Sequence, residues 1–429
     1  MKRRQKWALG LGIPAAVLVA VSLAVAWWLP TDEELAARLT VEAEERLGVR
    51  VTIGSAHWEL LPRPVVVVTD FRTRQSKPLV IGQLTAHLKA RALLDRKLVF
   101  ERIDVEDAVL PRNSIRAFSG TPGAREPDAG DGVVLEHLAF RNLTWISHGG
   151  IAVIYDGEIE FDARWRPRHA ELRRPGISPP FKLTLKREGD ADRWQARIHV
   201  GGGTLHGNAA LKSAAGGAMR LSGQLTPIDV EVASAMAAFN RRPAVGGKGS
   251  GKTVLSAEGK TAGELARSLH TRTVFSVNRA TILRFDLEQA ISTLGKEHDG
   301  QTALQELTGQ MDTQSTEEGI RATYTALKAR AGKRSVTGEA TIYKRQVEAS
   351  GTLYLADGAI GAPFTVSGPV SKPHASVPPA SYAAAVASAA AMTVIGPGAG
   401  ARIGDAVSRT LEGGEPQPVA AVPGAVKEN

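Results

Sequence analysis

The sequence predicts a mainly β protein: an N-terminal single transmembrane helix, then a long, curled, mostly antiparallel sheet forming an open groove, with a few short helices and an alanine-rich C-terminal helical region. Three observations carry this prediction. Residues 8–29 contain no charge, apolar and polar residues alternate over much of the chain after residue 48, and 44 glycines with 23 prolines supply many turns. With 43% hydrophobic and 23% charged residues, the chain has the composition of a folded protein.

Residues 1–29 are expected to form a cytoplasmic basic tail and a membrane anchor. At about 1.5 Å per residue, the uncharged stretch is long enough to cross a hydrocarbon core of roughly 30 Å. Basic residues precede it and Asp32 to Glu34 follow it, which places the N-terminus in the cytoplasm and the remaining chain outside. The residues expected to contact the bilayer are Trp7, Leu11, Val17, Leu18, Val21, Leu23, Trp27 and Trp28. A cleaved signal peptide is the alternative, because Ala24-Val25-Ala26 fits the small-x-small cleavage pattern.

Residues 30–118 are predicted to form a helix followed by strands. Thr31 and Glu34 make a capping box, and apolar residues then recur every four positions until Gly48 ends the helix. From Val49 the period changes to two, which is typical of strands with one apolar face.

The remaining boundaries follow shifts in composition. Residues 119–132 are a Gly/Pro/acidic linker, 133–252 a middle β region ending in a basic Gly-rich loop, 253–379 a C-terminal β region, and 380–429 alanine-rich helices and a disordered tail. The alternation predicts about eighteen strands in total. Short helices are expected at residues 228–239, 261–269, 286–294 and 303–307.

No catalytic or metal-binding pattern emerges, so we expect a non-enzymatic protein without a cofactor. The chain has no cysteine and no H-E-x-x-H histidine pair. Gly246 to Thr253 matches the G-x-x-x-x-G-K-T phosphate-loop pattern, but neither a buried strand before it nor a helix after it is predicted. We therefore interpret it as a basic loop and expect neither nucleotide nor metal there.

The half-apolar strands suggest a sheet whose inner face could hold acyl chains. The candidate groove residues are Val65, Val67, Leu84, Leu88, Leu98 and Phe100. The densest cationic cluster follows in the middle region, and its candidates for contact with lipid head groups are Arg164, Arg166 and Arg168. The formal net charge of +9 is not a nucleic-acid signal, because four of the cations precede the apolar stretch.

Two parts of the chain resemble the AsmA-like family of envelope proteins. In the N-terminal part, the features that resemble the family are the anchor, the capped helix and a series of short motifs. The motifs are Gly48-Val49-x-Val51-x-Ile53-Gly54, Trp58-x-Leu60-x-Pro62-x-Pro64, Pro78-Leu79, Leu93-Leu94 and Val109-Leu110-Pro111. In the C-terminal part they are residues 263–291, Leu304-x-x-Leu307-x-Gly309 and Pro363-Phe364-x-Val366-x-Gly368-Pro369-Val370-x-Lys372-Pro373. Residues 112–252 match no pattern of the family.

The resemblance implies a single-pass protein of the cell inner membrane with a periplasmic β-groove, similar to bridge-like lipid transfer proteins. The expected function is phospholipid transfer and outer-membrane homeostasis, with membrane phospholipid as the partner and other envelope proteins as further candidates. Nucleic acid is not expected. The alternative is a scaffold or assembly factor for outer-membrane protein biogenesis, which would present sheet edges to other proteins.

Overall fold

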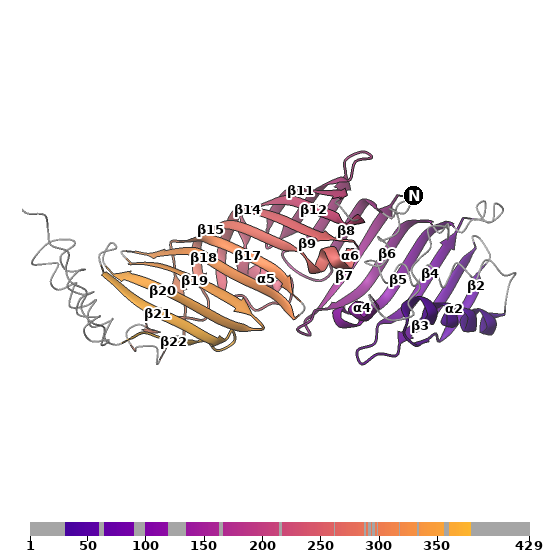
Figure 1. The fold of residues 1–429 in the computed structure, drawn as a ribbon, viewed down its shortest axis with the longest axis horizontal. Helices are drawn as coiled ribbons and strands as arrows, with labels where there is room; N and C mark the ends of the chain where they lie inside the picture. The colour runs from indigo at the N-terminus through magenta and orange to yellow at the C-terminus, as the bar shows by residue number, and fades with distance from the viewer. Residues whose placement is uncertain are drawn as a thin grey trace, which may run out of the picture. The chain divides into compact units, whose positions relative to one another are not determined.

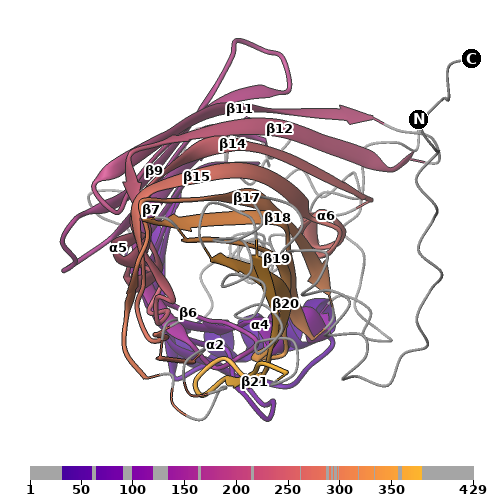
Figure 2. The ribbon, with the colours of Figure 1, turned by 90° about the vertical axis from the view of Figure 1, so that its left-hand side faces the viewer.

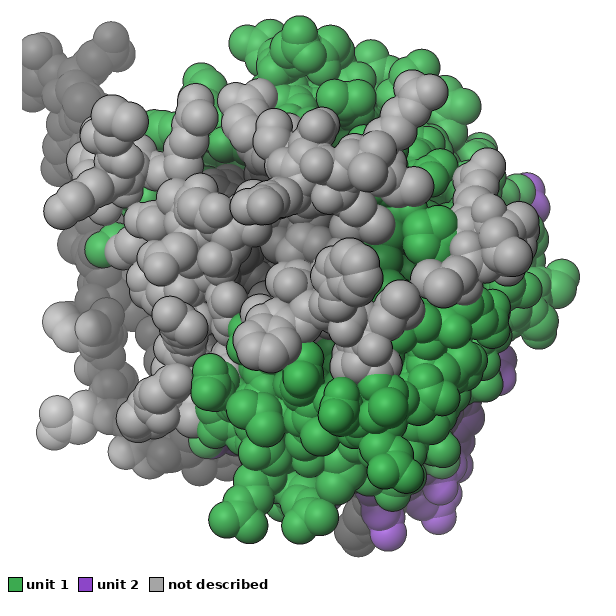
Figure 3. Space-filling view, turned by 90° about the vertical axis from the view of Figure 1, so that its right-hand side faces the viewer, with its two compact units in different colours: residues 1–277, 310–322 green, residues 278–309, 323–429 purple. Residues whose placement is uncertain are grey.

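The computed structural model describes residues 31–378, except for gaps at 60–63, 90–98, 119–133, 163–165, 214–216 and 356–359 and a few positions at 261, 287–288, 291–292, 294–296, 298, 317 and 333. The chain divides into two compact units (Figure 3): unit 1 comprises residues 1–277 and 310–322, and unit 2 comprises residues 278–309 and 323–429. The described part is mainly β, with 22 strands in one mostly antiparallel, open sheet and few helices. The predicted anchor, linker and alanine-rich region lie outside the described residues.

Unit 1 begins with the predicted capped helix, α2 (Asp32–Leu47). The Thr31 hydroxyl accepts a hydrogen bond from the Glu34 backbone N–H, and Gly48 ends the helix in the left-handed region with φ 66°. Five strands follow: β1 (Val51–Thr52), β2 (Ser55–Glu59), β3 (Val65–Thr73), β4 (Val80–Leu88) and β5 (Val99–Pro111). Figure 1 shows β2 to β5 side by side with α2 across one face.

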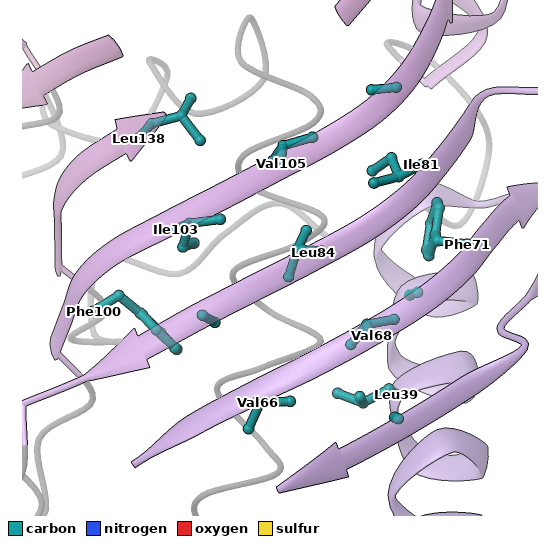
Figure 4. Packing of buried hydrophobic residues seen from close by; sticks show 14 of the residues in the cluster. Leu39, Val66, Val68, Phe71, Ile81, Leu84, Phe100, Ile103, Val105 and Leu138 are labelled. Carbon is teal, nitrogen blue, oxygen red and sulfur yellow. The ribbon is translucent and has the colours of Figure 1, made fainter. Parts of the chain in front are cut away.

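A closed core lies between α2 and this part of the sheet. Leu35 and Leu39 on the helix and Val66 on β3 are 0–1% exposed. The cluster continues through β4 and β5, and Figure 4 shows its side chains projecting from the same side of neighbouring strands. Phe100, also fully buried, is one of its largest members. The four-residue apolar spacing of α2 therefore has the predicted structural role, which is to cover one end of the sheet.

A crossover containing α4 (Arg112–Phe118) connects β5 to β6 (Val134–Ile146), and this pair of strands is parallel. The other strand pairs described in unit 1 are antiparallel. The next strands form a continuous meander: β7 (Ala152–Phe161), β8 (Pro167–Arg174), β9 (Phe181–Arg187), β10 (Arg193–Val200), β11 (Gly203–Ser213) and β12 (Met219–Ile228).

The last part of unit 1 contains two short helices beside one long strand. These elements are β13 (Val230–Glu231), α5 (Val232–Ala237), β14 (Val245–Gly259) and α6 (Ala262–Arg267). Helix α5 is shorter than the predicted 228–239, whereas α6 confirms the helix expected at 261–269.

The predicted Gly-rich loop at the end of residues 133–252 is wrong, because this segment is part of β14. Gly249 pairs with Val230, and Thr253 pairs with Leu225. The glycines allow close strand approach: a Cβ on Gly251 would lie 2.2 Å from the Val274 backbone oxygen. The phosphate-loop pattern thus lies within a strand, and the predicted boundary between residues 252 and 253 falls inside it.

The remaining strands are β15 (His270–Ile282), β16 (Thr302–Ala303), β17 (Glu306–Thr316), β18 (Gly319–Ala331), β19 (Arg334–Tyr343), β20 (Gln346–Leu355), β21 (Ile360–Pro369) and β22 (His374–Ser376). In unit 2, β19 to β22 form an antiparallel meander. The helix predicted at 303–307 is wrong. Ala303 pairs with Thr281, and the Leu304 N–H donates to the Ala280 carbonyl, so pairing with another strand outweighs the local helix propensity.

Candidate functional site

The strand register aligns two rows of apolar side chains across unit 1. Directly paired residues on neighbouring strands project to the same face of a sheet. The first row, from β3 to β12, is Val66, Ala86, Ile103, Leu138, Ile159, Ala170, Leu185, Ala196, Gly207 and Leu225. The second is Val68, Leu84, Val105, Phe140, Gly157, Leu172, Leu183, Ile198, Leu205 and Pro227. No polar side chain interrupts either row.

Burial changes along these rows. In β3 to β5 the row residues are fully buried in the core beneath α2. From β8 to β12 the corresponding side chains, such as Leu172, Leu183, Ile198 and Leu205, are only half-buried. We call this half-buried part, from β8 to β12, the apolar face.

The two short helices lie beside the apolar face at opposite ends of its strands. Helix α5 belongs to a cluster with Phe181 and Val200, whereas Leu265 of α6 packs with Trp194 and Leu211. Since Phe181 begins β9 and Trp194 lies near the start of the antiparallel β10, the two clusters occupy opposite strand ends. Figure 2 likewise shows α5 and α6 near opposite ends of β14. The half-buried rows run between the two helices and contact their clusters: the second row packs against the α5 cluster, and Leu185 of the first row packs against the α6 cluster.

Polar side chains hold α5 in this position. The Glu231 carboxylate accepts hydrogen bonds from the N–H groups of Ala233 and Ser234 at the helix start and from Gly247 on β14. At the other end, the Arg174 guanidinium donates to the Ala238 carbonyl and to the Asn240 side chain. A carboxylate at a helix N-terminus and a guanidinium at its C-terminus both complement the helix dipole.

Glu231 is expected to make the stability of unit 1 depend on pH. Burial alone would raise the pKa of Glu231, but the hydrogen bonds from Ser234, Gly247 and Ala233 outweigh burial and hold its pKa below the ordinary value. A lowered folded-state pKa contributes stability above the unfolded pKa, and this contribution is lost as pH falls through the folded pKa. The Glu231→Gln variant should therefore melt at a lower temperature than the wild type at neutral pH. The difference should disappear in acid. A constant difference in melting temperature at all pH values would contradict this assignment.

The six candidate groove residues do not share one face. Leu84, Leu88 and Phe100 belong to the closed core and are at most 3% exposed. Val65 and Val67 project from the opposite face, because they alternate with Val66 and Val68 along β3 and pair with His87 and Thr85. Leu98 lies outside the described residues. The half-buried residues of β8 to β12 were not among the candidates, although their period-two pattern was visible in the sequence.

The head-group candidates also have different environments. Arg164 lies outside the described residues, and Arg166 forms an ion pair with Asp192. Arg168 is exposed and lines a polar cavity of about 570 Å³ with His169, Lys186 and Arg187. Of the two described arginines, Arg168 is the exposed one.

A charge cluster joins two strand turns near this cavity. The side chain of Arg187, 4% exposed, contacts Asp162 at 2.6 Å and Asp192 at 2.7 Å. It also donates to the carbonyls of Asp190 and Ala191. With its donors directed at protein acceptors, Arg187 connects the β7–β8 and β9–β10 turns and is a structural residue.

The polar face opposite the apolar rows contains one group with metal-ligand chemistry among the described residues. The ligand atoms of Glu158, His169 and Glu171 lie within 4.8 Å of one another. Lys182 already pairs with Glu171 at 2.7 Å. The site neighbours a cavity lined by Arg102, Arg141 and Arg173, so nearby positive charge opposes cation binding there.

No family model, curated protein or solved structure matches this chain. Among the described helices, none has the length and apolar character needed to cross a bilayer. The fold and the two faces of the sheet are therefore the observations that bear on function.

Proposed function

We propose that this protein is a non-enzymatic, inner-membrane-anchored envelope protein that holds phospholipid acyl chains on its apolar face. In this role it would transfer phospholipid through the periplasm and contribute to outer-membrane homeostasis. The observation that carries the proposal is the pair of uninterrupted apolar rows, half-buried from β8 to β12. The resemblance of the N- and C-terminal parts to AsmA-like proteins supports the same function.

The rows suit acyl chains because they are continuous and chemically uniform. Removing apolar surface from water contributes roughly 25 cal/mol per Å², and a chain lying along a row would contact several strands. Large and small residues also alternate: Ala170 lies between Ile159 and Leu185, and Ala196 follows Leu185. This alternation leaves space for a ligand above the small residues.

Site-specific photo-crosslinking in the full-length protein tests the proposal. A photoreactive amino acid at Ile198, in the native membrane, should form a phospholipid adduct detectable by mass spectrometry. The matched control is Thr184, which belongs to the neighbouring strand but projects from the opposite face, as its pairing with Arg197 shows. Equal adducts at both positions, or none at Ile198, would rule out an acyl-chain site.

A substitution then tests whether the site is continuous. Leu183 pairs directly with Ile198, so Leu183→Asp should lower the phospholipid adduct at Ile198 roughly tenfold, since a charge there opposes an apolar ligand. Thr184→Asp should leave the adduct unchanged. Circular dichroism of each variant confirms that the β structure persists. Protein adducts in place of lipid adducts at Ile198 would favour the scaffold function instead.

A further inference from the structure

The sheet of unit 1 is electrically asymmetric along its strand order. Strands β3 to β8 carry six Lys/Arg and ten Asp/Glu, whereas β9 to β14 carry nine Lys/Arg and two Asp/Glu. The nine cations are Lys182, Lys186, Arg187, Arg193, Arg197, Lys212, Arg220, Lys248 and Lys252. The two acids are Glu231 and Glu258. The Glu231 carboxylate accepts hydrogen bonds at the start of α5.

Ion pairing strengthens this contrast. In the first group of strands, Arg102 pairs with Asp104 and Arg141 with Glu106. In the second group Lys182 and Arg220 have acidic partners, and Arg187 is buried in its charge cluster. Six exposed cations of the second group form no ion pair with any described residue: Lys186, Arg193, Arg197, Lys212, Lys248 and Lys252.

Strand alternation places these cations on the polar face. Lys186 pairs with Gln195 and Arg197 with Thr184, and both pairs alternate with the apolar rows. Arg193 precedes Trp194 and Lys212 follows Leu211, whose side chains are buried on the other side. We call this surface of β9 to β14 the basic face.

Exposed aliphatic side chains also lie on the basic face. Ile228 on β12 is 48% exposed and Val254 on β14 is 50% exposed. Both alternate with residues of the apolar side, since Pro227 pairs with Leu205 and Thr253 pairs with Leu225. The strand residues assigned to this face include no Phe, Trp or Tyr, so the aromatic stacking surface typical of single-stranded nucleic-acid sites is missing from them.

We propose that the basic face docks on an anionic lipid surface. Each Lys or Arg near such a surface contributes about 1 kcal/mol of attraction, and exposed aliphatic groups add apolar contact with the head-group boundary. The proposal is independent of the acyl-chain site, because the two surfaces lie on opposite sides of the sheet. Docking would place the apolar face of the same strands close to a membrane.

Vesicle binding by the full-length chain in phosphatidylcholine nanodiscs tests the proposal. The probe is a vesicle of equal parts phosphatidylglycerol and phosphatidylcholine, compared with one of phosphatidylcholine alone. Binding should require the anionic lipid and weaken as salt is raised. The triple variant Arg197→Gln, Lys212→Gln and Lys252→Gln should lose roughly hundredfold in affinity. Retention of wild-type affinity by this variant would overturn the proposal.

A matched control removes equal charge elsewhere. Arg72→Gln, Arg141→Gln and Arg173→Gln neutralise three exposed cations of the first group of strands, and this variant should bind like the wild type. Equal losses in the two triple variants would indicate a net-charge effect and overturn the assignment to the basic face. The phospholipid adduct at Ile198 should persist in both triple variants, so failure of docking is distinguishable from failure of the acyl-chain site.

The aliphatic residues distinguish a membrane from a soluble polyanion. Ile228→Ser with Val254→Ser should weaken binding to the anionic vesicles several-fold, because the lost contact is apolar. The same variant should bind single-stranded DNA as the wild type does. If DNA binds more tightly than the vesicles and the vesicle affinity is unchanged by these substitutions, the basic face is a nucleic-acid surface and the proposal is wrong.

Discussion

Replacing Phe100 with alanine should destabilise unit 1 by about 3–5 kcal/mol, the usual cost of truncating a buried phenylalanine. Phe100 is 0% exposed and pairs with Leu88 on β4 and with Leu135 on β6. Both neighbours are at most 3% exposed, and they belong to continuous strands. The core therefore has little freedom to collapse into the space, and most of the cavity cost should remain. Denaturant unfolding followed by circular dichroism measures the change.

A substitution on the exposed face of α2 serves as the control. Val41 lies on α2, opposite the helix face that contacts the sheet, and is 58% exposed. Val41→Ala should change the stability by less than about 0.5 kcal/mol. If Phe100→Ala also costs less than about 1 kcal/mol, Phe100 is not part of a closed core. In that case Leu84 and Leu88 would again be candidates for a ligand-accessible groove.

Local sequence patterns predicted those elements of the fold that depend on interactions between residues close in sequence. The capping pair Thr31 and Glu34 and the left-handed Gly48 define α2, because each acts within one helical turn. Alternation identified β9 and β10, since one face of each strand is apolar. Both signals describe a residue and its near neighbours in sequence. They carry no information about which strands become neighbours in space.

Long-range pairing explains the predictions that were wrong. The segment Gly246 to Lys252 has the composition of a loop, yet it lies in a strand, because β13 pairs with Lys248 and Gly249 and β12 pairs with the residues from Thr253 onward. The parallel β5–β6 pair was not predicted, because the crossover between the strands shows its direction only once both strands are placed. Pairing partners from distant parts of the chain thus outweigh local propensity at these positions.

The sequence predicted an amphipathic sheet but not the position of its half-buried rows. An amphipathic sheet was expected, and its apolar residues were sought in the N-terminal part, where the valine run of β3 is the most hydrophobic sequence. That run has both faces buried, so Val65 and Val67 project away from Val66 and Val68. In the half-buried rows each strand contributes only two residues, mostly leucine, isoleucine or alanine, with Gly207 and Pro227 among them. Their continuity depends on the register, which no single strand encodes.

Arg187→Ala should have an effect comparable to that of Phe100→Ala, because it would leave buried acceptors without partners. The Arg187 side chain is 4% exposed and that of Asp162 is 9% exposed, and their contact is 2.6 Å. Removing one member of a buried ion pair typically costs about 3–5 kcal/mol, since the remaining charge is poorly solvated. Two carbonyls of the β9–β10 turn would lose their donor as well. The variant should therefore unfold at much lower denaturant concentration.

Arg197→Ala is the matched control, since it removes the same residue type from the neighbouring strand. Arg197 is exposed and has no ion pair with a described residue, so its stability change should stay within about 0.5 kcal/mol. If the two substitutions lower the free energy of unfolding by the same amount, the Arg187 cluster does not connect the turns. A large cost for Arg187 alone would mean that the ends of β7 to β10 are held by buried charge.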